Sequence, residues 1–210
     1  MPVFRQGEAP PAWCALKGFA VVDLAAGEIA GGERNRARER LLATLGSVQV
    51  SFPGGGSQVI REGQFIDLPA EVTAWRVRST RNAQIVALSG VWGDELGGCG
   101  TFRAANEAVP VNSGDPVGYK KTTSVDSHYH DCDEYWIVLE GGGTVVVGDR
   151  HLAVTAGDCV PIGLGHHHDL ATVTVPVKAV YFETTLEGEK RVGHLWNHTH
   201  GSAQPRAERI

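Results

Sequence analysis

Apolar and polar residues alternate over short stretches of the chain, and glycine-rich turns separate these stretches. Val48 and Val50 alternate with serine and glutamine, and Val145 and Val147 follow a run of three glycines. Side chains of a β-strand point to opposite faces in turn, so a period of two predicts strands with one buried face. Most of the 27 glycines lie between such alternations. The pattern predicts an all-β protein.

The segment Glu33–Leu45 has two interpretations. Its charges and leucines are compatible with a helix, but a comparison with the second half of the chain favours a repeated β-unit. Glu39 precedes Gly46 by seven residues, as Glu134 precedes Gly141, and the offset between the two pairs is 134 − 39 = 95.

Two further pairs of segments repeat at nearly the same distance. Gly63–Ala74 matches Gly157–His168 at 157 − 63 = 94, and Gln84–Leu88 overlies Lys178–Phe182 at the same offset. A long fixed period without internal gaps indicates duplication of one structural unit. We therefore expect two similar β-units in tandem.

Composition and charge exclude several classes of protein. Of the 210 residues, 42% are hydrophobic and 20% are charged, which is ordinary for a globular protein. The net charge is 19 − 24 = −5, and the basic residues form no block beyond the short run Arg34–Arg40. Phosphate binding needs a concentrated basic patch, so we expect no nucleic-acid partner. The N-terminus lacks a secretory signal, and no apolar run is long enough to span a membrane. A cytoplasmic protein without membrane contact is predicted.

The four cysteines, Cys14, Cys99, Cys132 and Cys159, show no C-x-x-C spacing. Without a secretory signal, their even number does not indicate a disulfide framework. Cys132 and Cys159 lie within the segment 128–168, which contains the candidate metal ligands described next. We expect both cysteines to be bystanders, because the histidines and the glutamate of that segment already supply enough ligands.

Candidate chemistry is concentrated between His128 and His168. His128 and His130 stand two residues apart, so on a strand they point to the same side. Neutral imidazoles together with a carboxylate such as Glu134 suit a divalent transition metal. A later histidine, from the run 166–168, would complete the set.

These residues resemble the two motifs of the cupin superfamily, H-x-H-x(3)-E-x(6)-G and G-x(5)-P-x-G-x(2)-H. The first motif is matched without a gap by His128, His130, Glu134 and Gly141. The second is matched by Gly157, Gly163 in place of the proline, Gly165 and His168. Two positions depart from the pattern, because Thr122 replaces the opening glycine of the first motif and Thr172 replaces an expected asparagine. Neither departure removes a metal ligand.

The resemblance implies two cupin-type, jelly-roll β-barrels in tandem, a bicupin. The predicted segments are an N-terminal arm (1–15), a degenerate barrel (16–92), a linker (93–116), a metal-binding barrel (117–185) and a C-terminal tail (186–210). Trp13 is expected to pin the arm onto the body. In the degenerate barrel, the positions of the metal ligands are occupied by Glu33, Asn35, Glu39 and Ala74. We expect the two glutamates there to be solvated loop charges.

Three smaller expectations concern the surroundings of the motif. Tyr119–Val125 is predicted to be the strand that leads into it, and Lys120 and Lys121 are expected to be a solvated pair, with capture of an anionic substrate as the alternative. The pair His198 and His200 in the tail is interpreted as part of a lid or an interface strand rather than as a metal site.

The resemblance also implies the chemistry. One divalent metal (Mn, Fe, Ni, Zn or Co) would be held by His128, His130, Glu134 and His168, and the ungapped match selects His168 rather than His166 or His167 as the third histidine. In a six-coordinate metal, four protein ligands leave about two positions open for adjacent substrate oxygens or for O₂.

Further roles are predicted around this ligand set. His166 and Tyr181 are the candidate catalytic residues that move a proton, with His167 as an alternative to His166. Asp169 or Asp131 is expected to orient a ligand histidine.

The predicted function is that of a metalloenzyme acting on a small oxygen-rich substrate, a sugar or a hydroxy or keto acid. Isomerase or epimerase, dioxygenase and decarboxylase chemistry all remain open, because fold does not fix function. The alternative is a small-molecule binding or sensory cupin without catalysis. A homodimer is expected from the habit of cupins to pair through edge strands.

Overall fold

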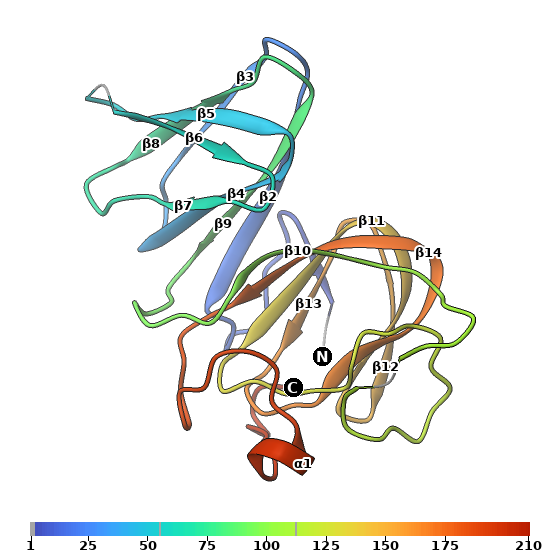
Figure 1. Cartoon of the computed structure of the whole chain (residues 1–210). Helices are drawn as coiled ribbons and strands as arrows, with labels where there is room; N and C mark the ends of the chain where they lie inside the picture. The colour runs from blue at the N-terminus through green and yellow to red at the C-terminus, as the bar shows by residue number, and fades with distance from the viewer. Residues whose placement is uncertain (1–2, 55, 112) are drawn as a thin grey trace. The chain divides into compact units, whose positions relative to one another are not determined.

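The computed structural model describes residues 3–54, 56–111 and 113–210 (Figure 1). Strands dominate these residues, and the described helical structure is one short turn, α1 (Asn197–His200). The chain divides into two compact units. The N-terminal unit contains residues 6–10 and 15–92, and the C-terminal unit contains residues 3–5, 11–14 and 93–210. The prediction of an all-β protein is confirmed.

The N-terminal unit consists of two four-stranded antiparallel sheets. The first has the order β2 (Leu16–Leu24), β9 (Ala83–Gly90), β4 (Arg38–Leu45), β7 (Phe65–Asp67). The second has the order β3 (Ile29–Glu33), β8 (Ala74–Arg78), β5 (Ser47–Ser51), β6 (Ser57–Arg61). The helical interpretation of Glu33–Leu45 is therefore wrong, because most of this segment is the central strand β4.

The core of the N-terminal unit draws side chains from both of its sheets. Leu41 and Ile85 of one sheet belong to the same buried cluster as Val50 and Val77 of the other, and each of these four is fully buried. The predicted alternation in β5 is confirmed, since Val48 and Val50 are buried whereas Gln49 between them is exposed.

The C-terminal unit is built on one six-stranded antiparallel sheet. Its order is β1 (Phe4–Arg5), β13 (Asp158–Ile162), β11 (Glu134–Val147), β14 (His168–Glu183), β10 (Cys99–Ala104), and β12 (Arg150–Thr155) pairs with β11. The apolar faces of these strands enclose a second core, to which Trp136, Val145 and Leu170 belong. Trp13 packs against this core, in agreement with its predicted role in holding the arm.

The two long strands β11 and β14 curve strongly (Figure 1). Their pairing contains several register shifts between Val138 and Val145, and such irregularities bend a strand and increase its twist. Gly141 lies within this stretch at φ 78°, and a Cβ at this position would lie 2.0 Å from the carbonyl oxygen of Pro176. Only glycine fits there, so the bend is encoded by the glycine run.

The strand pairing in the two units follows the offsets found in the sequence. Glu39 pairs with Ser89 in the N-terminal unit, and Glu134 pairs with Glu183 in the C-terminal unit, at offsets of 134 − 39 = 95 and 183 − 89 = 94. The pairing of β4 with β7 and of β5 with β6 is likewise repeated by β11 with β13 and with β12. No sheet in the described part of the chain is closed by pairing of its first and last strands, so two tandem closed barrels stay a prediction.

Two segments differ from their predicted structure. Cys99–Ala104 lies within the predicted linker 93–116 but forms β10, which pairs over its whole length with β14. Tyr119–Val125 was expected to be a strand and is irregular. The Thr123 hydroxyl donates a hydrogen bond to the carbonyl oxygen of Leu170, so a side-chain hydrogen bond is made where a strand would pair through its backbone.

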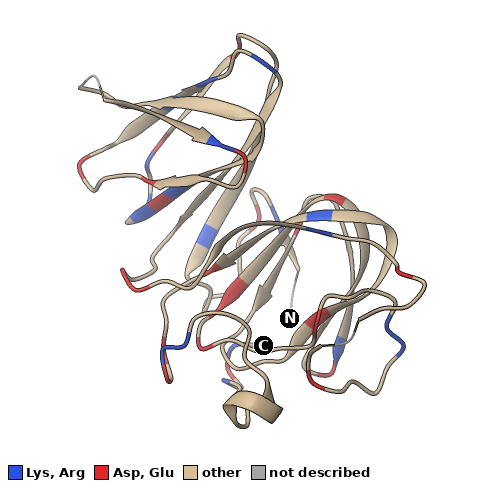
Figure 2. Cartoon of the chain, viewed as in Figure 1, with Lys and Arg blue, Asp and Glu red and all other residues tan. Residues whose placement is uncertain are grey.

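Acidic and basic residues are interspersed along each unit (Figure 2). No helix of the described residues is both long and apolar enough to cross a membrane.

Candidate metal centre

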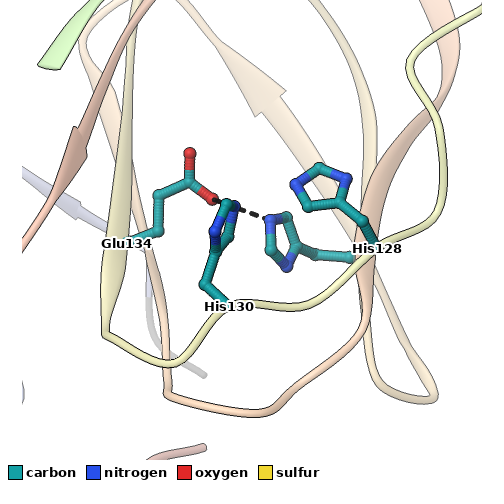
Figure 3. A group of neighbouring side chains, drawn as sticks. His128, His130 and Glu134 are labelled. Atoms are coloured by element: carbon teal, nitrogen blue, oxygen red, sulfur yellow. Dashed lines mark ion pairs between the residues drawn. The ribbon is translucent and has the colours of Figure 1, made fainter. Parts of the chain in front are cut away.

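Four buried side chains meet where the first residues of β11 and β14 lie near each other. Glu134 begins β11 and His168 begins β14, and the backbone of His168 pairs with that of His128 through two hydrogen bonds of 2.9 and 3.2 Å. His130 lies two residues after His128 in the sequence. The carboxylate of Glu134 faces the imidazole rings (Figure 3). One nitrogen or oxygen atom from each of the four residues lies within 4.8 Å of the others.

Hydrogen bonds to the backbone fix the tautomers of two of these histidines. The Nδ1 atom of His128 lies 2.9 Å from the carbonyl oxygen of Asp126, and Nδ1 of His168 lies 3.0 Å from that of His166. Because a carbonyl only accepts, Nδ1 carries the proton in both rings and Nε2 presents a lone pair. Trp136 Nε1 donates to Glu134 Oε1 at 2.8 Å, which leaves Oε2 free to face the imidazoles.

The atoms that converge here have no hydrogen-bond partners. Within the described residues, six buried side-chain nitrogen or oxygen atoms are unsatisfied, and five of them belong to this cluster: His128 Nε2, both ring nitrogens of His130, Glu134 Oε2 and His168 Nε2. An unsatisfied buried polar atom costs about 1–3 kcal/mol. His168 Nε2 and Glu134 Oε2 lie only 2.7 Å apart, and two lone pairs cannot bond to each other. A shared cation can satisfy one atom from each of the four residues, so the residues fit a metal ion.

Burial keeps the three imidazoles neutral. It lowers the pKa of His128 to about 3 and that of His168 to about 4, and it lowers the pKa of His130 well below its ordinary value. The same loss of solvent raises the pKa of Glu134. Neutral histidine is the form that binds a metal, so the lone pairs are available at neutral pH.

A cavity of about 490 Å³ borders the cluster within the C-terminal unit. It is lined by His128 and Glu134 of the cluster, by Tyr181 and Glu183 of β14, by parts of β10, by Trp136, and by Val192–His194 of the tail. Tyr181 thus lies where a catalytic residue is expected, and burial raises the pKa of its phenol.

Glu183 is a member of the cavity wall that the sequence did not reveal. Its Oε2 accepts a hydrogen bond of 2.7 Å from the backbone of Gly98, and its Oε1 lies 4.0 Å from His130 Nε2. Burial and the neighbouring Glu134 raise its pKa to about 7. A Cβ on Gly97 would lie 2.2 Å from Glu183 Oε2, so the glycines assigned to a linker make room for this side chain.

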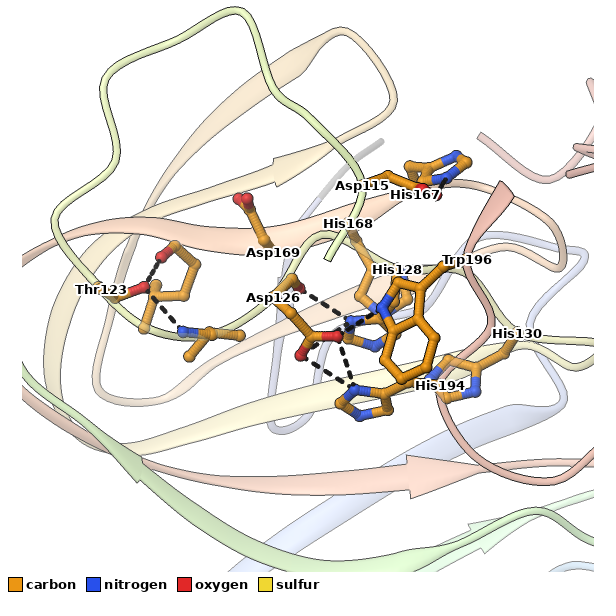
Figure 4. A network of polar contacts seen from close by, with 12 residues as sticks. Asp115, Thr123, Asp126, His128, His130, His167, His168, Asp169, His194 and Trp196 are labelled. Atoms are coloured by element: carbon orange, nitrogen blue, oxygen red, sulfur yellow. Dashed lines mark hydrogen bonds and ion pairs between the residues drawn. The ribbon is translucent and has the colours of Figure 1, made fainter. Parts of the chain in front are cut away.

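The C-terminal tail contributes His194 to the same cavity. The ring of His194 stacks on that of His128, with centroids 3.6 Å apart and planes 2° from parallel. Asp126 holds this arrangement, since its carboxylate lies 3.0 Å from His194 Nδ1 and accepts a hydrogen bond of 2.8 Å from Trp196 Nε1 (Figure 4). Burial opposes protonation of His194, but these contacts with Asp126 outweigh it and raise the pKa of His194. No local spacing in the sequence signals this partnership.

The structure places the other predicted catalytic residue, His166, away from the cavity. Its Nε2 lies 2.9 Å from the carbonyl oxygen of Arg206, and its ring is not among the described groups that line the cavity. The alternative, His167, bonds to Asp115 at 2.8 Å, and His198 bonds to the same carboxylate at 2.7 Å. The geometry therefore gives neither His166 nor His167 a role in proton transfer at the cluster.

The predicted orienting carboxylates have other partners. Asp169 is fully buried and accepts hydrogen bonds from Tyr119 and from Lys121, whose Nζ lies 2.8 Å away. Asp131 pairs with Arg191 at 3.1 Å. Backbone carbonyls orient His128 and His168 instead. Lys121 is also not solvated as expected, because its side chain is only 7% exposed.

A further expectation fails on burial. Glu39 was expected to be a solvated charge but is only 6% exposed, whereas Glu33 is exposed as expected. That Cys132 is a bystander stays a prediction, and its sulfur lies within 4.8 Å of possible ligand atoms of His130 and Glu183. Burial raises the pKa of the Cys132 thiol and keeps it protonated. In the described part of the chain, Cys159 joins no such group.

Comparisons with known proteins agree with this geometry. The family model of the cupin domain matches residues 100–183. Over 215 residues the chain is 51% identical to the uncharacterized protein y4oW of Sinorhizobium fredii (strain NBRC 101917 / NGR234), and the match covers 100% of this chain and 97% of that protein.

Solved structures of low sequence identity share the fold. An IolB-like protein from Salmonella typhimurium LT2 is 17% identical, with a TM-score of 0.54, over 87% of this chain and 88% of its own. Oxalate decarboxylase from Bacillus subtilis, a protein with Mn(II) centres, is 12% identical, with a TM-score of 0.51, over 81% of this chain and 70% of its own. At these identities the likeness concerns the fold alone.

Proposed function

Because the chain belongs to the cupin superfamily, we propose that it is a metal-dependent cupin that acts on a small oxygen-rich molecule. One divalent transition metal per chain (Mn, Fe, Ni, Zn or Co) is held by His128, His130, Glu134 and His168. The observation that carries this proposal is the convergence of four buried nitrogen and oxygen atoms without hydrogen-bond partners, one from each of the four residues. The Mn(II) centres of the oxalate decarboxylase with a similar fold support manganese as one choice.

The cavity beside the cluster supports a small substrate. Its volume of about 490 Å³ falls within the range of about 300–1,000 Å³ that is usual for small-molecule sites. A bound divalent metal would act as a Lewis acid toward substrate oxygens. A sugar or a hydroxy or keto acid presents such oxygens in adjacent positions.

Two side chains of β14 are placed to handle protons beside the substrate. Tyr181 and Glu183 stand two residues apart on one strand, so both point into the cavity. The carboxyl of Glu183 is anchored by the backbone of Gly98 at 2.7 Å, and its proton can be exchanged with a substrate hydroxyl. Phe102 and Trp136, with ring centroids 5.1 Å apart, supply an apolar wall that limits access of water. Isomerase or epimerase, dioxygenase and decarboxylase chemistry all fit these groups.

The N-terminal unit is proposed to be a second cupin unit without metal ligands, which makes the chain a bicupin. The matched strand registers of the two units support this origin. The similarity in fold to the IolB-like protein extends over both units, because it covers 87% of this chain and neither unit alone makes up that share. Within the described residues, possible groups of metal ligands occur in the C-terminal unit.

Elemental analysis of protein purified without a histidine tag tests the proposal. We expect about one divalent transition metal per chain, loss of the metal in Glu134→Gln, and retention in the matched variant Glu39→Gln. Oxygen uptake and product formation are then measured over a panel of sugars and of hydroxy and keto acids. Two tightly bound metals per chain, or none, would contradict the ligand assignment. A metal-loaded protein that binds a panel member without converting it would instead be the sensory or binding cupin.

A further inference from the structure

The N-terminal unit contains its own cavity, of about 350 Å³. Residues from β2, β3, β4, β8 and β9 line it, and Glu39 of β4 is among them. By sequence offset and by strand register, Glu39 stands in this unit where Glu134 stands in the C-terminal unit. The histidine positions, however, carry Glu33, Asn35 and Ala74, so a metal is not the expected occupant.

Glu39 lines this cavity, and one of its two carboxylate oxygens accepts a hydrogen bond from the protein. The side chain is 6% exposed, and its Oε1 accepts a hydrogen bond of 2.5 Å from Trp75 Nε1. Among the described residues, no hydrogen-bond partner is found for Oε2. Burial raises the pKa of Glu39. Oε2 is not one of the solvent-inaccessible unsatisfied atoms of the described residues, so it is open to the cavity and can accept a hydrogen bond from a ligand there.

Arg34, a basic group whose charge acts on Glu39, is already hydrogen-bonded to the backbone. The guanidinium of Arg34 donates to the carbonyl oxygens of Leu68 at 3.3 Å and Pro69 at 2.5 Å, and also to those of Arg36 and Ala37. Its charge lowers the pKa of Glu39 only in part. Arg34 therefore stiffens the loop beside the cavity and does not satisfy Glu39.

The remaining lining residues indicate the class of the ligand. Lys17 and Arg36 balance Glu33 and Glu39, so the cavity wall has no net charge that would select an ion. Such a wall favours a neutral ligand.

Neutral polar groups are also present in the wall. The Asn35 amide both donates and accepts hydrogen bonds. The Ser89 hydroxyl donates to the carbonyl of Gly18 at 3.3 Å, so its oxygen is left as an acceptor. Phe19 and Trp75 supply aromatic surface. A wall that combines hydrogen-bonding side chains with aromatic surface suits the hydroxyl groups and the C–H faces of a sugar or a cyclic polyol.

We propose that the N-terminal unit binds a small, neutral, polyhydroxylated molecule of monosaccharide size in this cavity, and that one of its hydroxyl groups donates to Glu39 Oε2. The volume lies near the lower end of the range for small-molecule sites, about 300–1,000 Å³. This second site needs no metal and is independent of the function proposed for the cluster at His128. The arrangement at Glu39 repeats that at Glu134, where an indole also holds one carboxylate oxygen and leaves the other free.

The two sites can be observed separately in one sample. Full-length protein labelled with 5-fluorotryptophan gives one ¹⁹F resonance for each tryptophan, and the variants Trp75→Phe and Trp136→Phe assign the reporters of the two cavities. D-glucose, D-galactose, D-mannose and myo-inositol are titrated as neutral probes, with D-gluconate and D-glucosamine as charged comparators. We expect at least one neutral probe to shift the Trp75 resonance saturably, also in the metal-deficient variant Glu134→Gln.

Three variants link that shift to the cavity. Glu39→Gln should weaken the affinity of the probe about tenfold or more, as expected for loss of a hydrogen bond to a buried carboxylate. Ala20→Phe fills the cavity from β2 and keeps Glu39, so it should abolish binding. Glu71→Gln, at an exposed position of the same unit, should leave binding unchanged. Thermal unfolding curves of all variants confirm that they are folded.

Three results would overturn the proposal. The first is a Trp75 resonance that no neutral probe shifts saturably in folded wild-type protein. The second is a saturable shift that persists unweakened in both Glu39→Gln and Ala20→Phe. The third is a response limited to the charged comparators or to the Trp136 resonance, which would mean that the ligand class or the site is wrong.

Discussion

Replacing Trp136 with phenylalanine removes the hydrogen bond that holds the carboxylate of Glu134, the proposed metal ligand. In the structure Trp136 Nε1 donates to Glu134 Oε1 at 2.8 Å, and both residues are only 4% exposed. Phenylalanine preserves much of the apolar contact but has no donor. The carboxylate then loses the partner that directs Oε2 toward the histidines, and metal affinity should fall while the fold persists.

The size of the loss can be estimated in two ways. A hydrogen bond to a charged group contributes about 1.5–3 kcal/mol. Loss of a side chain that orients a metal ligand costs about 10–100-fold in affinity. At about 1.36 kcal/mol per factor of ten, that range corresponds to about 1.4–2.7 kcal/mol, so the two estimates agree. We expect the dissociation constant of the metal recovered with the wild-type protein to rise about 10–100-fold in Trp136→Phe.

Competition with a chromogenic chelator of known affinity measures this constant directly. Trp75→Phe is the matched control, because Trp75 makes the same contact with Glu39, at 2.5 Å, in the N-terminal unit. The control should bind the metal as the wild type does. An unchanged dissociation constant in Trp136→Phe, or an equal loss in Trp75→Phe, would refute the assigned role of the indole.

Three further predictions follow from the same geometry. His168→Ala should lose the metal and His166→Ala should keep it, as measured by elemental analysis; the reverse result would transfer the ligand role to His166. Burial lowers the pKa of the cluster histidines to about 3 and about 4 for two of them, so the folded metal-free protein binds fewer protons than the unfolded chain below the ordinary histidine pKa of about 6.5. Its free energy of unfolding should therefore be fully present above pH 6.5 and fall as the pH drops toward 4, in denaturant titrations; a flat profile would contradict the burial argument. Asp169→Asn leaves the buried Lys121 uncompensated and should cost about 3–5 kcal/mol of stability, whereas Glu95→Gln, in an exposed ion pair of similar length, should cost under about 1 kcal/mol; equal losses in the two variants would disprove this difference.

The sequence alone was sufficient to predict the kind of fold and to select four residues that the structure brings together. His128, His130 and Glu134 lie on one short segment that contains an isolated bridge, a bend and the first residue of β11, so a few consecutive residues bring these three side chains together. The offsets of 95 and 94 residues likewise predicted the strand registers, because residues that pair across a duplicated unit keep their separations.

Local sequence patterns could not predict which residues surround the cluster. Glu183 lies beside Glu134 because β11 pairs with β14, and His194 lies on His128 because the tail returns to the cavity. Neither contact depends on a fixed spacing along the chain. Asp126 illustrates the same point, since what determines its role is the later residue His194.

The predictions that were based on glycine content and on charge were wrong for a physical reason. The glycines around Gly98 were interpreted as linker, because glycine permits both loose turns and close packing, and only the neighbouring Glu183 distinguishes the two. Lys121 and Glu39 were interpreted as solvated, because charged side chains usually are. Whether such a charge is buried depends on the presence of a partner such as Asp169 or Trp75, 48 and 36 residues away in the sequence. The sequence by itself determined the local ligand geometry and the registers of the repeated unit, and tertiary structure decided which distant groups share the low-dielectric interior.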